Sequence, residues 1–423
     1  EIYDKLVHNR NAQGRMLGQR GLSPMDIDKD RQGGDASSSQ EQLAGVRNRI
    51  DAIDDRLLEL LNERSRLSLQ VGRIKAGEKS NIFKPQREIE ILRRLSAGNP
   101  GPLPEKALKT IWREIFSSSR SLQRPLRVAF LGPEGTFSYF AGVEYLGHSA
   151  TYHSCSNIPA VFEEVNAGTC DLGVVPLENS LQGTVGVSFD LFLKYPVTIQ
   201  AELFSRISHC LLSTEERLSE IRTVYSHPQG LAQCSTWLRA HLPQAVVVPL
   251  ASTAQAAHRA LEEPGTASIG NGNLAELLRL NILARRIEDE AGNWTRFVII
   301  ANENSTKKLG TVRSRKPGAA PAEVKTSMLF TLPDQPGALS GILDLLAQNH
   351  INMCKLESRP LRGECWHYAF FADVDCDLLL PEHDALLREL GNRCMNFRLL
   401  GTYERGPQLD GVSNPDNEPS VSL

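Results

Sequence analysis

The stretch LLELLNERSRLSLQVGRIK, residues 57–75, decides the fold of the N-terminal part of the chain. Its apolar residues recur every three or four positions, which predicts an amphipathic helix. The same row extends back to Leu43 and predicts a helix of about 34 residues, about 50 Å long. Arg64 stands in this row where leucine is expected, and a charge facing a core needs a partner. The row is Leu43, Val46, Ile50, Ile53, Leu57, Leu60, Arg64, Leu67, Val71 and Ile74.

Arg64 and Lys75 point the same way on this helix, because eleven residues make almost three whole turns. Their Cα atoms are predicted to lie about 16 Å apart, which leaves room for a small molecule between the two side chains. Two cations that face one gap require an anion, and the planar guanidinium of arginine suits a carboxylate. The alternative is a coiled-coil arm, in which Arg64 sets the register by pairing with Glu59, Glu63 or a carboxylate of a second chain.

Arg47 lies near the same row, but about 42 Å along the helix from Lys75. The two cations therefore cannot share one ligand within a single chain. An antiparallel helix from a second copy would bring them together, so a functional Arg47 predicts a dimer. Ser119 and Gln123 stand four positions apart in a third predicted helix and share one of its faces.

Composition is typical of a protein with two to four domains: 423 residues, 41% hydrophobic and 23% charged. The net charge of −3 gives no sign of the basic surface that a nucleic-acid-binding protein needs. No apolar run of about 18 residues predicts a membrane helix, so we expect no membrane partner. The eight cysteines lack CxxC spacing, which favours buried thiols in the reducing cytoplasm over a metal site.

Changes in composition divide the chain into three domains. Residues 41–124 are predicted to be all helical. In residues 126–303 strands alternate with helices, which indicates an α/β domain. Residues 325–404 restart as a small α+β domain of the order βαββα. Three polar segments are expected to be disordered tails or a linker: residues 1–40, 304–324 and 405–423.

Polar side chains lie at the ends of several predicted strands of the α/β domain: most follow a strand, whereas Thr295 and Arg296 stand at the start of one. Ligands of α/β sheets bind where strand ends gather, so these side chains are candidate binding residues. For any single position an ordinary helix cap is the alternative, and His227 alone is equally compatible with a structural histidine. The candidates are Thr136, Ser138, Glu178, Asn179, Ser180, Ser226, His227, Gln229, Thr295 and Arg296.

The helical segments LAGVRNRIDAIDDRLLELLNERSRLSLQVGRIK, PQREIEIL and SSSRSLQ resemble the all-helical chorismate mutase family. This resemblance implies a pericyclic rearrangement of chorismate to prephenate, which rests on a held conformer and a stabilised ether oxygen. Lys75 and Gln123 match the family's pair at that oxygen, so both are implied to be catalytic. Lys84 stands where some members carry Asp. The implied chorismate-binding residues are Arg47, Arg64, Lys75, Arg87, Glu88, Ser119 and Gln123.

The strings GTFS, ENS, SHPQ and TRF, in this order, resemble prephenate dehydratase. The resemblance implies two α/β lobes flanking a cleft, similar to class II periplasmic binding proteins, and removal of CO2 and water from prephenate to give phenylpyruvate. Thr295 matches the catalytic residue, as a donor to the departing oxygen. Arg296 is implied to bind a carboxylate, with bracing of the lobe as the alternative. The implied prephenate-binding residues are Thr136, Ser138, Glu178, Asn179, Ser180, Ser226, His227, Gln229, Arg296 and Phe297.

The strings DQPGALSGIL and INMCKLESRP resemble the ACT regulatory domain of prephenate dehydratases. On pattern alone, an ordinary turn and edge strand explain both strings. The resemblance implies a phenylalanine site at a domain interface, although Ser340 stands where an apolar residue is common. The implied effector residues are Gly337, Ala338, Leu339, Glu357, Ser358 and Arg359.

These observations together predict a bifunctional enzyme of phenylalanine biosynthesis that is inhibited by phenylalanine. We expect a homodimer or higher homo-oligomer, with no metal and no organic cofactor. One alternative is an enzyme with dehydratase activity only, whose helical domain serves dimerisation. Another is a non-catalytic amino-acid sensor, which would need neither Lys75 nor Thr295.

Overall fold

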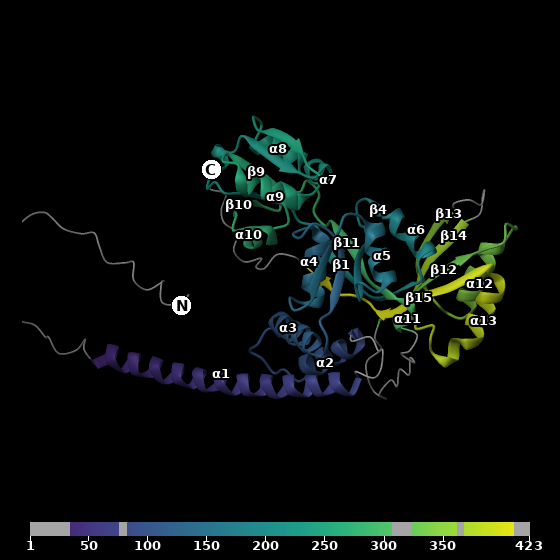
Figure 1. Ribbon diagram of the computed structural model, residues 1–423, viewed down its shortest axis with the longest axis horizontal. Coiled ribbons are helices and arrows are strands. Elements are labelled where there is room, and N and C mark those ends of the chain that lie inside the picture. The colour runs from purple at the N-terminus through teal and green to yellow at the C-terminus, as the bar shows by residue number, and fades with distance from the viewer. Residues whose placement is uncertain (1–33, 76–82, 307–322, 362–367, 410–423) are drawn as a thin grey trace, which may run out of the picture. The chain divides into compact units, whose positions relative to one another are not determined.

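The computed structural model describes residues 34–75, 83–306, 323–361 and 368–409 (Figure 1). The chain forms two compact units, residues 1–64 and residues 65–423. The first unit contains most of one long helix, and the second holds three β-sheets with their helices. None of the helices in the described part of the chain combines the length and the apolar character that crossing a bilayer requires.

Helix α1 spans Gly34–Lys75 and is 42 residues long. It begins inside residues 1–40, so the predicted disordered tail is wrong for residues 34–40; residues 1–33 lie outside the described residues. An existing helix gains one hydrogen bond for each residue that it adds, so a polar composition does not stop it. The predicted apolar row of α1 is exposed in the single chain at Leu43, Val46, Ile50, Ile53, Leu57, Leu60, Leu67, Val71 and Ile74.

Two shorter helices complete the helical domain. Helix α2 spans Pro85–Ala97 and has its proline in the first turn, where no N–H is needed. Helix α3 spans Glu105–Gln123 and buries Leu108 and Phe116. Its Ser117 Oγ accepts a hydrogen bond from the backbone N–H of Ser149 at 3.0 Å, which fixes α3 to the neighbouring α/β domain.

The first sheet of the α/β domain has the strand order β16-β5-β11-β3-β1-β2, with β4 beside β3. Strand β1 is parallel to β2 and β3, whereas β11 is antiparallel to β3 and β5. The strands are β1 Arg127–Leu131, β2 Thr151–Cys155, β3 Leu172–Asn179, β4 Gly183–Thr184, β5 Val197–Arg206, β11 Trp294–Asn302 and β16 Gln408–Leu409. The accompanying helices are α4 Phe137–Leu146, α5 Ile158–Ala167, α6 Gly186–Lys194 and α11 Glu303–Thr306.

The chain leaves this sheet after β5, forms a second sheet of order β10-β6-β9-β7-β8, and returns with β11. This course confirms the predicted two-lobed α/β architecture. The strands are β6 Cys210–Ser213, β7 Thr223–Ser226, β8 Val246–Pro249, β9 Thr266–Gly270 and β10 Asn281–Arg285. The helices are η1 Leu218–Glu220, α7 Pro228–Gln233, α8 Ser235–His241, α9 Thr253–Glu262 and α10 Asn273–Leu278.

The C-terminal domain is an antiparallel sheet of order β13-β14-β12-β15, which confirms the α+β class. The predicted order βαββα lacked the last strand, β15. Its sequence NFRLLGTYE interrupts the apolar alternation with Arg398 and Gly401, so a strand was not evident. The elements are β12 Val324–Thr331, α12 Ala338–Gln348, β13 Met353–Pro360, β14 Tyr368–Val374, η2 Pro381–His383, α13 Asp384–Arg393 and β15 Asn396–Glu404.

Two further boundary predictions are corrected. The predicted linker, residues 304–324, contains the end of α11 and the first residue of β12, and residues 307–322 lie outside the described residues. The predicted C-terminal tail, residues 405–423, begins with ordered backbone. Strand β16 pairs in parallel with β5, because β5 is an edge strand with unpaired backbone groups.

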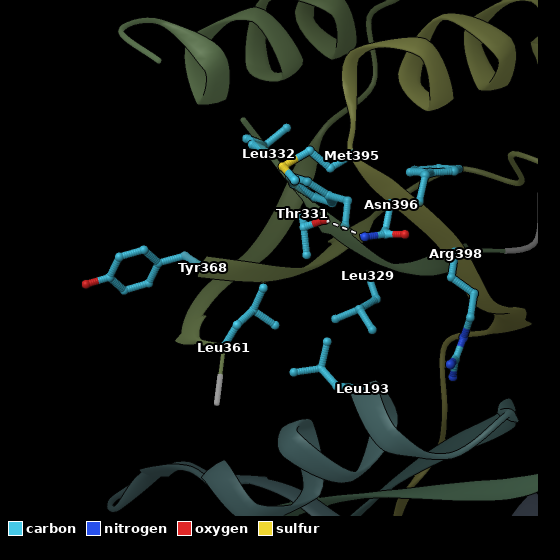
Figure 2. A pocket seen from close by; sticks show the side chains of 11 residues that line it. Leu193, Leu329, Thr331, Leu332, Leu361, Tyr368, Met395, Asn396 and Arg398 are labelled. Carbon is cyan, nitrogen blue, oxygen red and sulfur yellow. Dashed lines mark hydrogen bonds between the residues drawn. The ribbon is translucent and has the colours of Figure 1, made fainter. Parts of the chain in front are cut away.

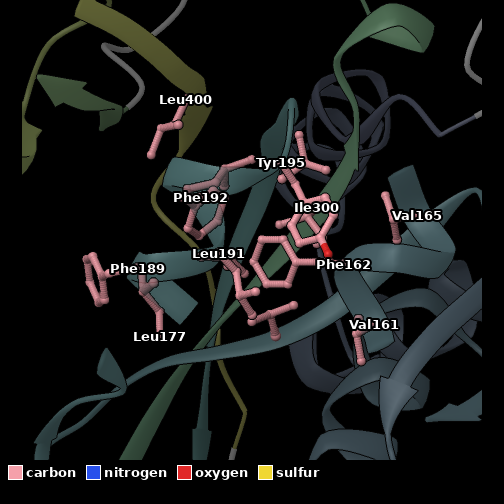
Figure 3. Packing of buried hydrophobic residues seen from close by; sticks show 14 of the residues in the cluster. Val161, Phe162, Val165, Leu177, Phe189, Leu191, Phe192, Tyr195, Ile300 and Leu400 are labelled. Carbon is pink, nitrogen blue, oxygen red and sulfur yellow. The ribbon is translucent and has the colours of Figure 1, made fainter. Parts of the chain in front are cut away.

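A hydrophobic cluster joins the C-terminal domain to the first lobe (Figure 3). Phe162 and Phe192 lie edge to face with ring centroids 5.2 Å apart, and Phe189 meets Phe371 of β14 at 4.5 Å. Leu400 and Tyr403 of β15 are buried in the same cluster. Fully burying one such side chain stabilises the fold by about 1.5–3 kcal/mol, so this cluster contributes to the contact between the two domains.

Candidate active sites

Thr295 and Asn179 lie opposite each other on the neighbouring strands β11 and β3. The Asn179 amide donates hydrogen bonds to Thr295 Oγ1 at 3.0 Å and to Asn293 Oδ1 at 2.6 Å. Its carbonyl oxygen accepts from the backbone N–H groups of Leu181 and Gln182. The Thr295 hydroxyl is therefore an acceptor toward Asn179, which leaves its proton available to another oxygen.

Asn293 was missed by the sequence analysis, although it stands two residues before Thr295 in the segment NWTRF. It is 2% exposed and fixes the orientation of the Asn179 amide. Ser180, a predicted substrate ligand, instead accepts from Trp294 N at 2.9 Å and donates to the Gly292 carbonyl at 3.2 Å. Both residues hold the turn after β3 against the start of β11.

The second lobe reaches this turn through Gln229 of α7. Its amide donates to Gln182 Oε1 at 2.7 Å, across the two lobes. His227, the residue before α7, accepts from the Gln229 backbone N–H at 3.3 Å and so acts as a helix cap. Ser226 is fully buried and donates to the Ile269 carbonyl at 2.7 Å, which is a structural role. Of the predicted SHPQ residues, only Gln229 extends its side chain to the opposite lobe.

The GTFS residues lie at the loop between β1 and α4. Thr136 caps α4: its hydroxyl accepts from Tyr139 N and donates to the Leu131 carbonyl at 2.8 Å. Ser138 is buried in the first turn of that helix. Gly135 has φ +88°, and a Cβ there would lie 2.5 Å from Leu274 Cδ2 in the second lobe. The glycine therefore allows the loop of one lobe to approach the other closely.

His209 is a buried histidine near this lobe contact that the sequence analysis did not single out. Its Nε2 lies 2.8 Å from Gln233 Oε1, and its ring meets Phe137 edge to face at 5.5 Å. Its Nδ1 is buried with no hydrogen-bond partner among the described residues. Burial lowers the pKa of His209, although the Gln233 hydrogen bond and Glu288 act in the opposite direction.

Arg296 does not extend toward the Thr295 hydroxyl but enters a buried charge cluster. Its Nε donates to Glu202 at 2.7 Å, and its Nη1 donates to Asp373 of β14 at 2.6 Å. Burial alone would lower the pKa of Arg296, but Tyr403, Asp373 and Glu202 raise it well above its ordinary value. The structure thus favours the bracing alternative over carboxylate binding.

The two other predicted residues beside this cluster are also engaged elsewhere. Glu178 forms an ion pair with Lys355 of β13, with Lys355 Nζ 2.8 Å from Glu178 Oε1. Phe297 was implied to contact substrate; it is 2% exposed and belongs to the hydrophobic core between the sheet and α4. The structure thus gives Phe297 a packing role, and its implied substrate contact stays a prediction.

Gln123 of α3 lies against α1 near the end of that helix. A Cβ on Gly72 of α1 would lie 3.2 Å from the Cα of Gln123, so the two helices are in close contact there. Gln123 Nε2 donates to the Ser119 carbonyl at 3.2 Å, and the Ser119 hydroxyl donates to the Ile115 carbonyl at 2.7 Å. Lys75 is the last residue of α1, and its side chain lies outside the described residues. Arg47 and Arg64 lie on α1 as predicted.

Glu88 of α2 forms an ion pair with Arg120 of α3, which is almost fully buried. The same guanidinium donates to the Leu146 carbonyl and lies over the Phe83 ring. The sequence does not mark Arg120 as a candidate, because the residues around it in SSSRSLQ show no apolar periodicity. Arg87, in contrast, is exposed and pairs with Glu90 at 3.2 Å. The two implied ligands therefore have different partners: Glu88 pairs with the buried Arg120, and Arg87 pairs with Glu90 at the surface.

The implied effector residues divide between a turn and strand β13. Gly337 has φ +83° and precedes α12, whose first residues are Ala338 and Leu339. Glu357 accepts a hydrogen bond from Thr184 at 2.9 Å, and Arg359 pairs with Asp190 of α6 at 3.3 Å. Ser358 points to the other face of β13 and is exposed. Two of the three strand residues therefore contact the α/β domain.

A cavity of about 480 Å³ lies between α6 and the sheet of the C-terminal domain (Figure 2). None of the implied effector residues lines it. Arg398 contributes its guanidinium, which donates to the carbonyls of Tyr195 and Val197. The lining residues are Leu193, Leu329, Phe330, Thr331, Leu332, Leu361, Tyr368, Met395, Asn396, Phe397 and Arg398.

Comparison with known proteins agrees with this three-part architecture. Residues 46–124 match the chorismate mutase type II family, residues 128–305 match prephenate dehydratase, and residues 326–392 match the ACT domain. The "Bifunctional chorismate mutase/prephenate dehydratase" of Aquifex aeolicus (strain VF5) is 38% identical over 369 residues, which cover 86% of this chain and 98% of the relative.

Two solved structures share the fold of about two thirds of the chain. The prephenate dehydratase from Arthrobacter aurescens in complex with L-Phe is 33% identical, with a TM-score of 0.56 over 66% of this chain and 90% of that one. The quorum-quenching acylase GqqA is 29% identical, with a TM-score of 0.56 over 66% of this chain and 98% of that one. With three matching domains and a relative of nearly full length, the chain belongs to the family of bifunctional chorismate mutase/prephenate dehydratases.

Proposed function

We propose that the chain converts chorismate to prephenate in its helical domain and prephenate to phenylpyruvate in its α/β domain. The observation that carries the second activity is the Thr295 hydroxyl, which Asn179 holds and whose proton has no acceptor among the described residues. It lies on a strand that returns from one lobe to the other, beside the turn that Gln229 contacts. A preorganised donor between two lobes suits a substrate from which hydroxide must depart.

The dehydratase step breaks two bonds of prephenate and forms one. The electron pair of the C–CO2 bond becomes a double bond of the aromatic ring and expels the ring hydroxyl, so that CO2 and hydroxide leave, and the hydroxide takes a proton from solvent to become water. Hydroxide is a poor leaving group, and a hydrogen bond from Thr295 stabilises the negative charge on the departing oxygen. Asn179 keeps the threonine oriented, while Asn293 keeps Asn179 oriented.

The mutase step needs no nucleophile, because the rearrangement of chorismate is pericyclic. Lys75 and Gln123 would stabilise negative charge on the ether oxygen, and the close contact at Gly72 brings the end of α1 to Gln123. Arg64 would bind a carboxylate of chorismate. Ser119 and Glu88 complete the implied binding residues, with Glu88 held by Arg120.

The working form is proposed to be a homodimer formed along α1. A helix of 42 residues that exposes an apolar row is unstable in water unless another surface covers it. An antiparallel second α1 would cover the row and carry Arg47 to the Lys75 end of its partner. The site would then contain residues of both chains.

The ACT domain is proposed to bind phenylalanine and inhibit the dehydratase. The effector residues on β13 contact the α/β domain through Thr184 and Asp190, so a ligand there would act on that domain directly. Inhibition requires that phenylalanine bind more tightly to a less active conformation. We propose a cytoplasmic location, since the seven described cysteines are all free thiols.

The test supplies purified full-length protein with chorismate and measures prephenate and phenylpyruvate separately. Lys75→Ala is expected to abolish the first step and spare the second, and Thr295→Ala is expected to do the reverse. Adding phenylalanine should slow the second step. A wild-type protein that makes neither product would support the sensor alternative, and one that makes only phenylpyruvate would support the dehydratase-only alternative.

A further inference from the structure

The two strands that carry Thr295 and Asn179 also carry a charged pair on their other face. The register pairs Thr295 with Asn179 and Arg296 with Glu178. Successive side chains of a strand alternate between its faces, so the charged pair lies behind the functional pair. Arg296 Nη1 and Glu178 Oε2 are 4.0 Å apart.

Both members of this charged pair are held by the ACT domain. Lys355 of β13 binds Glu178 with an Nζ to Oε1 distance of 2.8 Å, and the Lys355 side chain is only 11% exposed. Asp373 of β14 binds Arg296 at 2.6 Å and is fully buried. Tyr403 of β15 accepts a further hydrogen bond from Arg296 at 3.1 Å.

The acidic partners of Arg296 are themselves fixed. Ser327 of β12 donates a hydrogen bond to Asp373 at 2.5 Å. Lys325 of the same strand donates to Glu202 at 3.1 Å. The cluster therefore balances the cations Arg296 and Lys325 against two carboxylates. Buried charges interact strongly and tolerate few arrangements, so the position of the ACT sheet determines the position of Arg296.

Lys355 also belongs to a row of side chains on one face of β13. Lys355, Glu357 and Arg359 alternate with exposed residues, and each contacts the α/β domain. Their partners there are Glu178, Thr184 and Asp190. A shift of β13 would therefore reach Glu178, the neighbour of Asn179, through Lys355.

We propose that Lys355 and Asp373 are positioning residues of the dehydratase site, acting from the ACT domain through Glu178 and Arg296. The inference rests on the proposed dehydratase function of Thr295 and deepens it. A change of about 1 Å at a reacting group costs about 100-fold in rate, so losing either anchor is expected to lower turnover of prephenate. Substrate affinity should change little, because neither anchor lies on the face of Thr295.

The test measures prephenate turnover by full-length variants, with mutase rate and thermal unfolding measured on the same samples. Lys355→Gln is expected to lower kcat about tenfold with KM within about twofold, while Lys355→Arg retains most of the activity. Asp373→Asn is expected to lower kcat at least as much. If the buried Asp373→Asn variant fails to fold, Lys355→Gln alone still decides the inference.

Asp190→Asn is the matched control, because it breaks another ion pair between β13 and the α/β domain, whose carboxylate lies on α6 rather than on β3 or β11. It should leave kcat unchanged. The inference is overturned if Lys355→Gln, and Asp373→Asn where it folds, turn over prephenate at the wild-type rate, or if Asp190→Asn loses as much activity. If the wild-type protein converts prephenate and both variants do so at the same rate, this inference is refuted and the proposed function stands. A wild-type protein without that activity refutes the proposed function as well.

Discussion

Gly72 of α1 lies against Gln123 of α3: a Cβ added to the glycine would lie 3.2 Å from the Gln123 Cα. Only a residue without a large side chain permits this approach. The contact explains how the end of a long, exposed helix is fixed to the rest of the helical domain.

Gly72→Leu is expected to abolish chorismate mutase activity and to leave prephenate turnover unchanged, because the larger side chain separates α1 from Gln123. Gly72→Ala should retain activity, since a shift of a few tenths of an ångström suffices. The control is Gly45→Ala on the same helix, where a Cβ meets nothing within 4 Å. Gly45→Ala should stabilise the helix by up to about 1 kcal/mol with full mutase activity. Equal rates for Gly72→Leu and wild type would contradict the close contact.

Glu88→Gln is expected to destabilise the fold as well as lower mutase activity. The change leaves the buried Arg120 without its carboxylate, which costs about 3 kcal/mol or more of unfolding free energy. Urea denaturation measures this loss. Arg87→Gln serves as the comparison, because its exposed pair with Glu90 contributes about 0–1 kcal/mol. A Glu88→Gln variant with wild-type stability would show that Glu88 serves the substrate only.

Acid is expected to destabilise the α/β domain through His209. Burial lowers the pKa of His209 in the folded chain, so below about pH 6.5 the unfolded chain binds a proton that the folded chain does not. The stabilising contribution is therefore complete above about pH 6.5 and is lost as the pH falls toward the lowered pKa. His209→Gln should reduce this pH dependence, measured as the unfolding free energy from pH 7 to pH 5. An unchanged slope would exclude His209 as its source.

Arg64→Leu distinguishes the two interpretations of the charged position in the apolar row. A ligand for chorismate would be lost, so mutase activity should fall at least about 100-fold while the oligomeric state stays that of the wild type. A residue that only sets the register would instead change the oligomeric state when replaced. Sedimentation and the mutase assay on the same sample separate these outcomes.

The sequence predicted the elements that follow local rules. The period of α1, the proline that starts α2 and the alternation of strands and helices in residues 126–303 all depend on near neighbours. Strand β15 was missed because its buried residues, Leu400 and Tyr403, pack on another domain rather than follow an alternating pattern.

The candidate sites show the same limit. Thr295 and Asn179 were both selected from the sequence, and the structure places them in contact. Asp373 and Lys355 were not selected, because their partners Arg296 and Glu178 are far away in the chain. Arg120 and Glu88 are likewise joined only by the packing of two helices. Pairings of this kind leave no local pattern for sequence reasoning to use.

The pairing of β16 with β5 makes the catalytic sheet discontinuous in sequence. Residues 408 and 409, beyond the regulatory domain, complete a sheet whose other strands were synthesised more than a hundred residues earlier. During translation this sheet keeps an open edge until residues 408 and 409 have been made. A protein cut at the segment 304–324 would therefore lose an edge strand of its enzyme along with its regulator, so the two modules are not exchangeable units.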